Sequence, residues 1–428
     1  MSITNLSMQS FRGISDLTLE LDPQLNVLIG DNGSGKSSVL DCLGALLHHT
    51  SELVISLYSD LSKILNNSSD FEKPQPKNIF LDDDIAINNT ELAVQLEAIL
   101  NSLNLRCRIQ KESRDHSKAS INLLHPSSFA SLPRFFHSKS IPILIYYSVK
   151  RDILFEDSQD SQQTKSNNIL DAYNRAFAGG RVIFKEFFEW FKLLEELENE
   201  LIRDDPGYRD RQLESVRQAI YTFLPEFNDL RIRRRPELRM TVTKNGSELT
   251  INQLSDGEKN LLAMVGDLAR RLAIANPEMD KPLQGSGVVL IDEIELHLHP
   301  KWQRMIIPGL IRTFPNCQFI ITTHSPQVLG EVKDGKIFRL TNTESGVRAD
   351  IVRTYGRDSN RILEDEMGSS KRSQEIKDGL LSLFRLIDDG NLPEARELQV
   401  SLKEEIGFDE PEFARADVLI HRKEVLGR

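Results

Sequence analysis

Two short segments carry residue types suited to binding and cleaving a phosphate ester. Residues 30–37 read Gly-Asp-Asn-Gly-Ser-Gly-Lys-Ser, which puts three glycines, a lysine and a hydroxyl in one loop. Such glycines let backbone N–H groups face phosphate oxygens, while the lysine bridges the β- and γ-phosphates and the serine ligates Mg²⁺. Residues 288–293 read Val-Val-Leu-Ile-Asp-Glu. Asp292 would hold Mg²⁺, and Glu293 would polarise the attacking water. Together the two segments predict ATP hydrolysis.

A third segment completes the expected site. Residues 318–324 read Gln-Phe-Ile-Ile-Thr-Thr-His, an apolar strand that ends in a histidine. We interpret His324 as a γ-phosphate sensor at the carboxyl edge of a parallel sheet, where ligands bind; the alternative is a structural histidine. The expected catalytic residues are Glu293 and His324, and the expected metal ligands are Ser37 and Asp292. The expected nucleotide-binding residues of the loop are Gly30, Asp31, Asn32, Gly33, Ser34, Gly35, Lys36, Ser37 and Ser38.

Hydrophobic patterns around these motifs predict an α/β fold. Residues 3–21 alternate as two antiparallel strands, and residues 26–29 form a short buried strand that enters the loop. A helical pattern follows over 38–47, so strand, loop and helix stand in the order that a phosphate-binding loop requires. Residues 141–147 and 287–293 are apolar strands; an all-apolar strand belongs in a sheet covered on both faces.

A second anion-binding segment precedes a long helix. Residues 254–259 read Leu-Ser-Asp-Gly-Glu-Lys, and the pattern over 261–274 has a helical period. Ser255, Gly257 and the N-terminus of that helix form an anion nest. A kinase-type ATP site that lies within one chain does not need a second anion-binding nest. Before it, residues 237–251 alternate around an Asn-Gly pair, which predicts a β-hairpin.

With these motifs the chain resembles the ABC-type ATPases of the SMC/RecF branch. The resemblance implies a P-loop ABC/SMC-type ATPase head that uses ATP and Mg²⁺ and forms a homo-oligomer built from head-to-head dimers. It implies that Ser255, Gly257 and Glu258 serve the γ-phosphate bound by the opposite subunit. It also implies that Arg12, at the end of the first strand, assists nucleotide binding. His299 stands where transporter-type relatives carry an aspartate.

Two features leave alternatives open. His297 and His299 alternate on an extended segment and so face one way, which allows a metal site beside a structural reading. The glutamine-bearing loop of relatives has no counterpart after residues 141–147, where Lys150 and Arg151 follow. These two side chains either take part in gating or are simple charges at a strand end.

The phrases at 253–259, 268–277 and 355–363 resemble the ATPase subunit of Septu-type antiphage defence systems, which also occurs beside some retrons. This resemblance implies an ATP-hydrolysing regulatory subunit that controls a separate HNH nuclease, with phage DNA or retron RNA/DNA as a candidate ligand. The alternatives are a RecF/SMC-like repair ATPase that clamps DNA and, less favoured, an OLD-like nuclease. The tail lacks the Asp-x-Asp pair of such a nuclease, so we do not expect intrinsic nuclease activity.

The order of the segments divides the chain into four expected parts. These are a P-loop lobe over 1–147 with a variable, loop-rich insertion around 50–140, a short helical arm over 148–230, a second ATPase lobe over 231–353 and a helical extension over 354–428. The arm carries aromatic residues that either pack within it or form a partner surface: Phe187, Phe188, Trp190 and Phe191.

Composition limits where the protein acts. The 428 residues carry a net charge of −11, which argues against a surface that binds nucleic acid everywhere. A local run of arginines over 231–239 is either a solvated strand edge or a nucleic-acid contact. No apolar run approaches the ~20 residues of a membrane helix, the N-terminus lacks signal-peptide features, and three cysteines argue against a disulfide framework. We therefore expect a cytoplasmic protein without a membrane partner.

Overall fold

The computed structural model describes residues 1–65, 84–86, 89, 91–100, 103–112, 140–149, 168–177, 184–344, 346–370 and 372–426. The chain forms two compact units, Met1–Ser359 and Asn360–Arg428. Lys150 and Arg151, whose part in gating the sequence left open, lie outside the described residues.

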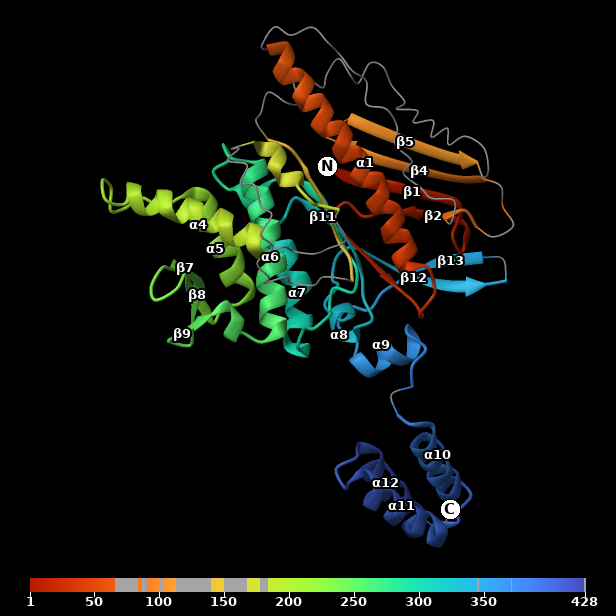
Figure 1. Cartoon of the computed structure of the whole chain (residues 1–428). Coiled ribbons are helices and arrows are strands. Elements are labelled where there is room, and N and C mark those ends of the chain that lie inside the picture. Colours follow the sequence, from red (N-terminus) through yellow and green to blue (C-terminus); the bar gives the residue numbers. More distant parts are fainter. Residues whose placement is uncertain are drawn as a thin grey trace. The chain divides into compact units, whose positions relative to one another are not determined.

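A six-stranded sheet forms the centre of the first unit (Figure 1). Its strands are β3 (Leu25–Ile29), β6 (Ile143–Tyr147), β10 (Gly287–Ile291), β11 (Cys317–Thr322), β12 (Lys336–Thr343) and β13 (Gly346–Val352). They lie in the order β13–β12–β3–β11–β10–β6, and all neighbours are parallel except β12 and β13. Every residue of β3, β6, β10 and β11 is buried, as expected of strands covered on both faces, although β3 includes Asn26 and β11 includes Gln318 and Thr322.

The register of these strands gathers the motifs at one edge of the sheet. Ile291 pairs with both Tyr147 and Ile321, and Leu28 pairs with Thr322. Because the strands are parallel, the residues that follow them leave the sheet together at its carboxyl edge. The glycine-rich loop, the acidic pair and the histidine segment therefore meet, as the sequence predicted.

Helices pack on the sheet or connect its strands. They are α1 (Lys36–Leu65), α6 (Asp256–Ala275), α7 (Pro300–Thr313) and α8 (Pro326–Leu329). The first of these packs on β6, β10 and β11, and α7 connects β10 to β11. Figure 1 shows β11 between α1 and the α6–α7 pair.

A second, antiparallel sheet lies beside the first. Its strands are β1 (Ser2–Phe11), β2 (Ile14–Glu20), β4 (Glu91–Leu100) and β5 (Leu103–Glu112), in the order β2–β1–β4–β5. The predicted antiparallel pair over 3–21 is confirmed. The expectation of a loop-rich insertion around 50–140 is wrong for two parts of it: α1 continues to Leu65, and β4 and β5 form a hairpin on β1. In β4, Leu92, Val94 and Leu96 are buried, an alternation with period two.

The described part of the predicted arm is helical. It contains the 3-10 helix η2 (Ile169–Tyr173), α4 (Phe184–Leu201) and α5 (Arg211–Phe223), and β7 (Phe227–Arg233), β8 (Arg239–Lys244) and β9 (Ser247–Thr250) follow. The last two strands form the predicted hairpin. Phe187 and Phe191 are buried, and a Cβ on Gly266 of α6 would lie 3.0 Å from the Phe187 ring. These two aromatic residues therefore pack within the unit and form no partner surface.

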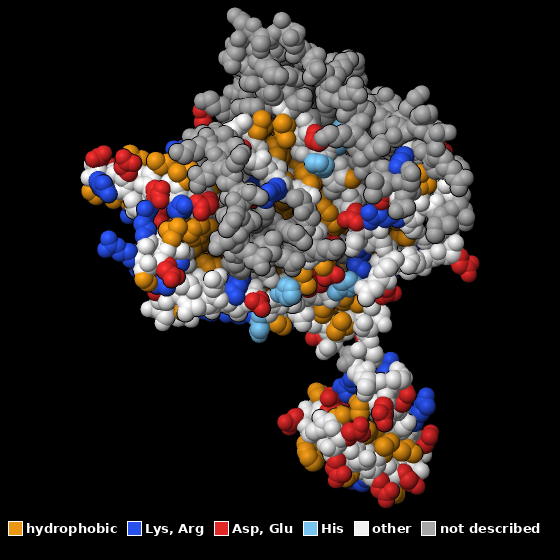
Figure 2. Space-filling view, viewed as in Figure 1, with side chains coloured by type: hydrophobic (Ala, Val, Ile, Leu, Met, Phe, Trp, Pro, Cys, Tyr) orange, Lys and Arg blue, Asp and Glu red, His pale blue; other side chains and the backbone are white. Residues whose placement is uncertain are grey.

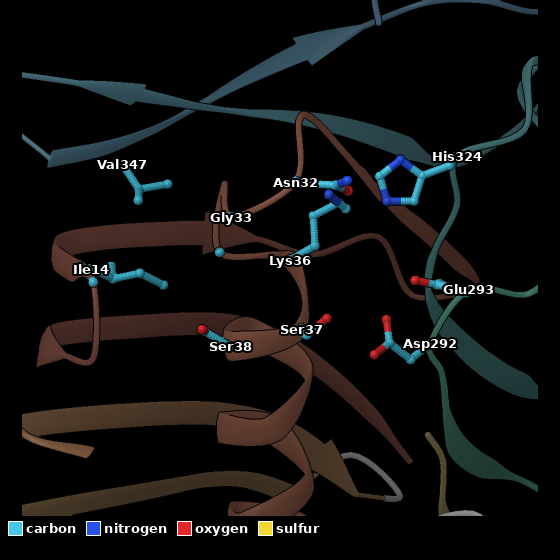
Figure 3. A pocket seen from close by; sticks show the side chains of 12 residues that line it. Ile14, Asn32, Gly33, Lys36, Ser37, Ser38, Asp292, Glu293, His324 and Val347 are labelled. Carbon is cyan, nitrogen blue, oxygen red and sulfur yellow. The ribbon is translucent and has the colours of Figure 1, made fainter. Parts of the chain in front are cut away.

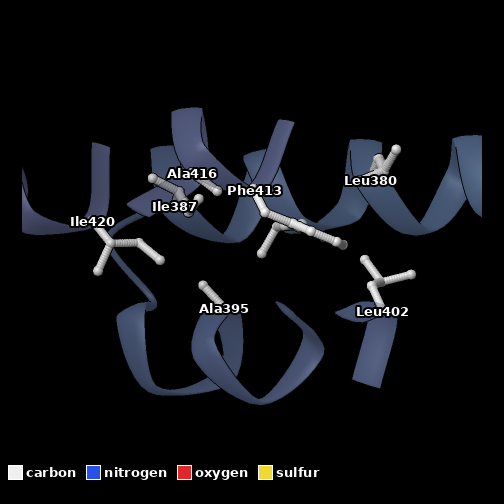
Figure 4. Packing of buried hydrophobic residues seen from close by; sticks show 8 residues of the cluster. Leu380, Ile387, Ala395, Leu402, Phe413, Ala416 and Ile420 are labelled. Atoms are coloured by element: carbon white, nitrogen blue, oxygen red, sulfur yellow. The ribbon is translucent and has the colours of Figure 1, made fainter. Parts of the chain in front are cut away.

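The second unit is helical. After α9 (Ser359–Asp365), its helices are α10 (Gln374–Asp388), α11 (Leu392–Ile406) and α12 (Pro411–Leu426). Apolar side chains from the last three form one core, in which Phe413 lies among Ile387, Ala395 and Leu402 (Figure 4). The predicted helical extension is thus present. Among the described residues, no helix is long and apolar enough to cross a membrane.

Candidate functional site

The glycine-rich segment forms a tight loop between β3 and α1. Gly30 has a φ of +142°, and a Cβ there would lie 2.3 Å from the carbonyl oxygen of Leu340 on β12. Only glycine tolerates this backbone and this contact. Lys36 begins α1, so the loop leads straight into a helix N-terminus. The unpaired N–H groups of that first turn attract anions.

Lys36 is held by its own loop. Its Nζ donates hydrogen bonds of 2.8 Å to the carbonyl oxygens of Gly30 and Asp31. Burial lowers the pKa of Lys36, while the carboxylates of Asp292 and Asp31 raise it. The ammonium therefore sits in a partly desolvated place with carbonyl partners that a phosphate would replace.

The acidic pair is held by the two neighbouring strands, β6 and β11. The N–H of Asp292 donates to the carbonyl of Tyr147, and the hydroxyl of Thr322 donates to Asp292 Oδ1. The N–H of Glu293 donates to the same hydroxyl oxygen at 2.7 Å. Glu293 adopts a φ of +46°, a conformation that is uncommon outside glycine. This turn directs its carboxylate into the pocket beside Asp292 (Figure 3).

His324 follows β11 and reaches the same pocket. Its backbone N–H donates to Glu295 Oε1, and the preceding hydroxyl of Thr323 donates to Glu295 Oε2. Figure 3 shows the imidazole ring beside Asn32 and Lys36, on the side of the pocket that also carries Glu293. The structure thus brings together the three motif segments that the sequence placed at one edge.

One pocket collects most of the expected residues. It encloses about 240 Å³ and is lined by Gly13, Ile14, Asn32, Gly33, Gly35, Lys36, Ser37, Ser38, Asp292, Glu293, His324 and Val347. Small-molecule pockets usually measure roughly 300–1,000 Å³, so this one suits a phosphate chain better than a whole nucleotide. Ile14 and Val347 are apolar lining residues that the motifs did not indicate.

The donor set fits a hard cation. The side chains of Ser37 and Asp292 line the same pocket, one from α1 and one from the end of β10. A hydroxyl and a carboxylate facing a phosphate pocket are oxygen ligands of the kind that Mg²⁺ takes together with substrate phosphates. Among the described residues no cluster of three or more His, Cys, Asp or Glu side chains forms a separate metal site. His299 instead caps α7, its Nδ1 accepting from the N–H of Lys301.

Residues 254–259, which we call the signature segment, lie outside this pocket. Ser255 is the N-cap of α6 and forms a capping box with Glu258, whose carboxylate also pairs with Lys244. The Ser-x-x-Glu spacing indicates this cap in the sequence. Burial raises the pKa of Glu258, but Lys244 and Ser255 lower it to a net decrease. The Glu258 carboxylate is therefore engaged within the chain, by Ser255 and Lys244.

Arg12 also lies outside the pocket lining. Its guanidinium donates to Asp41 on α1 at 2.6 Å and to Asp84 at 2.9 Å. Asp41 in turn accepts a hydrogen bond from Tyr146. Arg12 thus joins the first hairpin to the helix that follows the glycine-rich loop, and its expected part in nucleotide binding stays a prediction.

A buried charge cluster links α6 to the central sheet. Asp267 accepts hydrogen bonds from Arg270, Arg271 and the hydroxyl of Tyr147. Burial alone would raise the pKa of Asp267, but Arg271 and Arg270 lower it to about 2. Tyr147 therefore contacts Asp292 through its carbonyl and α6 through its hydroxyl. The sequence did not indicate this cluster, because Tyr147 is 120 residues away from Asp267.

Comparison with known proteins places this arrangement in a family. The family model described as "AAA domain, putative AbiEii toxin, Type IV TA system" matches residues 25–330. The chain belongs to this AAA-domain family. It is 30% identical to the "Retron Ec83 probable ATPase" of Escherichia coli, over 98% of this chain and 87% of the relative.

Two more distant proteins resemble this AAA-domain chain. The "Septu protein PtuA" of Bacillus thuringiensis is 22% identical, over 91% of this chain and 90% of that protein. The solved structure "SMC head domain from Thermotoga maritima" is 12% identical, covers 82% of this chain and 100% of that chain, and has a TM-score of 0.45. The predicted resemblance to retron and Septu ATPases is confirmed.

Proposed function

We propose that this AAA-domain chain is the ATP-hydrolysing regulatory subunit of a bacterial antiphage defence complex, in which paired heads control a separate HNH nuclease. One observation carries the ATPase part. A single pocket holds Lys36 and Ser37 on one side and Asp292, Glu293 and His324 on the other. This set can bind a triphosphate, orient a water and neutralise developing charge.

Each side chain would have a distinct task. Lys36 would leave its two carbonyl partners to bind the β- and γ-phosphates, and the loop N–H groups would orient the phosphate chain. Ser37 and Asp292 would hold Mg²⁺, which supplies charge neutralisation on the phosphate oxygens. Glu293 would accept a proton from the attacking water, and His324 would donate a hydrogen bond to the γ-phosphate.

The dimer part of the proposal rests on what the pocket lacks. Ser255 and Gly257 do not line it, yet they stand at the N-terminus of a 20-residue helix that can bind an anion. A second head would bring this helix to the first head's γ-phosphate. Two chains would then enclose two ATP molecules, each completed by the other chain.

The nuclease part rests on relatives. One is named as a retron ATPase and another as a Septu protein, and the resemblance to Septu-type systems implies an HNH partner. The test is to mix the purified chain with an HNH protein encoded beside it. DNA cleavage should depend on which nucleotide the ATPase holds. Cleavage that ignores the nucleotide would remove the regulatory part and leave the ATPase part standing.

The Glu293→Gln variant tests the site itself. We expect hydrolysis to fall at least about 100-fold, because a general base contributes roughly 10²- to 10⁴-fold, while ATP binding stays within twofold. Dimers should accumulate with ATP and Mg²⁺ in light scattering. The matched control is Glu237→Gln, an exposed glutamate in the loop before β8, which should behave like the wild type. Wild-type hydrolysis by Glu293→Gln would refute the assigned mechanism.

The rival repair-clamp reading depends on the arginines over 231–239. In the structure Arg231 pairs with Asp229, Arg233 with Glu248 and Arg234 with Glu196. Figure 2 shows blue and red side chains interleaved over the α4 and β7–β9 region of the face in view. Paired arginines offer little net positive charge to a phosphate backbone, which favours the solvated strand edge for these three residues. Arg235 and Arg239 of the same run are exposed and stay available to the clamp alternative.

A further inference from the structure

The carboxylate of Glu295 binds the segment that carries His324. Glu295 Oε2 accepts the Thr323 hydroxyl at 2.7 Å, and Oε1 accepts the backbone N–H of His324 at 2.5 Å. Charge-assisted bonds of this kind are shorter and about twice as strong as neutral ones. Two bonds from one planar group fix both the position and the direction of the segment after β11. Glu295 itself does not line the pocket.

Thr322 at the end of β11 also binds the segment that follows β10. The hydroxyl of Thr322 binds Asp292 and the N–H of Glu293, and the carbonyl of Thr322 accepts from the N–H of Ile294 at 3.1 Å. The segment after β10 and the end of β11 are thus joined by side chains from both. We call these bonds between residues 292–295 and 322–324 the interstrand clasp.

We propose that Glu295 is a positioning residue for ATP hydrolysis: through the clasp it fixes the imidazole of His324 relative to the carboxylate of Glu293. The inference rests on the proposed ATPase function and assigns to Glu295 no contact with ATP. A group misplaced by about 1 Å can cost roughly 100-fold in rate, although substrate binding is retained. We therefore expect that loss of the Glu295 carboxylate lowers kcat and changes the KM for ATP much less.

Two substitutions separate hydrogen bonding from charge. Glu295→Ala removes both acceptors, and kcat should fall roughly 10- to 100-fold with KM for ATP within about twofold. Glu295→Gln keeps an acceptor for the His324 N–H and offers an amide N–H to the Thr323 oxygen, so it should restore most of kcat. Glu295→Asp keeps the charge but shortens the reach, and it carries the comparison where the alanine variant does not fold. The measurement is steady-state ATPase kinetics beside a thermal unfolding midpoint for each variant.

A double-substitution cycle decides whether Glu295 acts through His324. In a His324→Ala background, Glu295→Ala (or Glu295→Asp) should lower kcat less than about twofold further, since the group that it positions is already gone. Effects that multiply, a KM that rises as kcat falls, or a kcat of Glu295→Ala and Glu295→Asp within about twofold of the wild type would each overturn the proposal.

The ATPase assignment can fail separately. If the wild-type chain does not hydrolyse ATP, or if Glu293→Gln hydrolyses at its rate, the proposed function fails before Glu295 is considered. If Glu293→Gln abolishes hydrolysis and the Glu295 variants leave kcat unchanged, only the positioning role of Glu295 fails.

Discussion

The hydroxyl of Thr322 donates a hydrogen bond to Oδ1 of Asp292. Thr322 ends β11 and Asp292 follows β10, the neighbouring parallel strand, so a single short side chain crosses from β11 to the acidic turn after β10. The same oxygen accepts the N–H of Glu293. One threonine thereby sets the place of the expected metal ligand and of the expected general base.

Thr322→Val tests this arrangement with almost no change of shape. We expect ATP hydrolysis to fall about tenfold or more because the acidic turn loses its fixed geometry. The free energy of unfolding should drop by about 1–3 kcal/mol, the usual cost of a lost buried hydrogen bond. The control is Thr313→Val on α7, whose hydroxyl has no hydrogen-bond partner among the residues that the structure describes. Equal effects from both substitutions would refute a specific role for Thr322.

Gly257→Ala probes the signature segment. A Cβ at this position would lie 2.7 Å from the carbonyl oxygen of His297 and 2.9 Å from the Trp302 ring, so the start of α6 must shift. Because these residues lie outside the chain's own pocket, ATP binding by the monomer should change little, while hydrolysis and ATP-induced pairing should fall. Calorimetry and light scattering measure the two properties. Gly207→Ala, in an exposed turn, is the control; loss of monomer ATP binding by Gly257→Ala would contradict the assignment.

Asp267→Asn should destabilise the fold through the two arginines that it leaves buried. Removing one partner of a buried ion pair typically costs about 3–5 kcal/mol, and urea unfolding at pH 7 measures it. The pKa of Asp267 is lowered to about 2 from an ordinary 3.8. Its ionisation therefore stabilises the fold above pH 4, and this contribution is lost as the pH falls towards 2. The difference from wild type should shrink in that window. Asp280→Asn, at an exposed pair with Arg211, should show neither effect.

Replacing Arg231, Arg233 and Arg234 with alanine tests the DNA-clamp alternative. Because each arginine already pairs with a carboxylate, we expect no change in ATP-dependent nucleic-acid binding. A clamp that used them would lose roughly 0.9 in the slope of log binding constant against log salt for each phosphate contact. Fluorescence anisotropy at several salt concentrations distinguishes the two outcomes. If the slope fell by the amount expected for about three phosphate contacts, the DNA-clamp alternative would be favoured again.

The parts of the site that the sequence predicted are those in which local pattern and chemistry coincide. The loop at 30–37 and the acidic strand end are recognisable because their residue types are needed at fixed spacing. The hydrogen bonds of Thr322 to the acidic turn and of Glu295 to the segment of His324 were not predicted, because a threonine at a strand end and a glutamate in a polar turn are common. These contacts depend on which strands are neighbours. The β4–β5 hairpin was also not predicted. The serine- and asparagine-rich sequence on either side of it obscured the alternation of buried and more exposed residues in β4.

The two hydrogen bonds of Tyr147 would link the hydrolysis of the two ATP molecules in a dimer. Its carbonyl binds the N–H of Asp292, and its hydroxyl binds Asp267 on the helix that begins with the signature segment. If heads pair as proposed, the bond to Asp292 lies at the ATP bound by the same chain. The bond to Asp267 lies on the helix whose N-terminus would contact the ATP bound by the neighbouring chain. A small rotation of α6 would then be felt at both nucleotides, so turnover would show cooperativity in ATP concentration. A dimer of Tyr147→Phe chains would hydrolyse its two nucleotides independently.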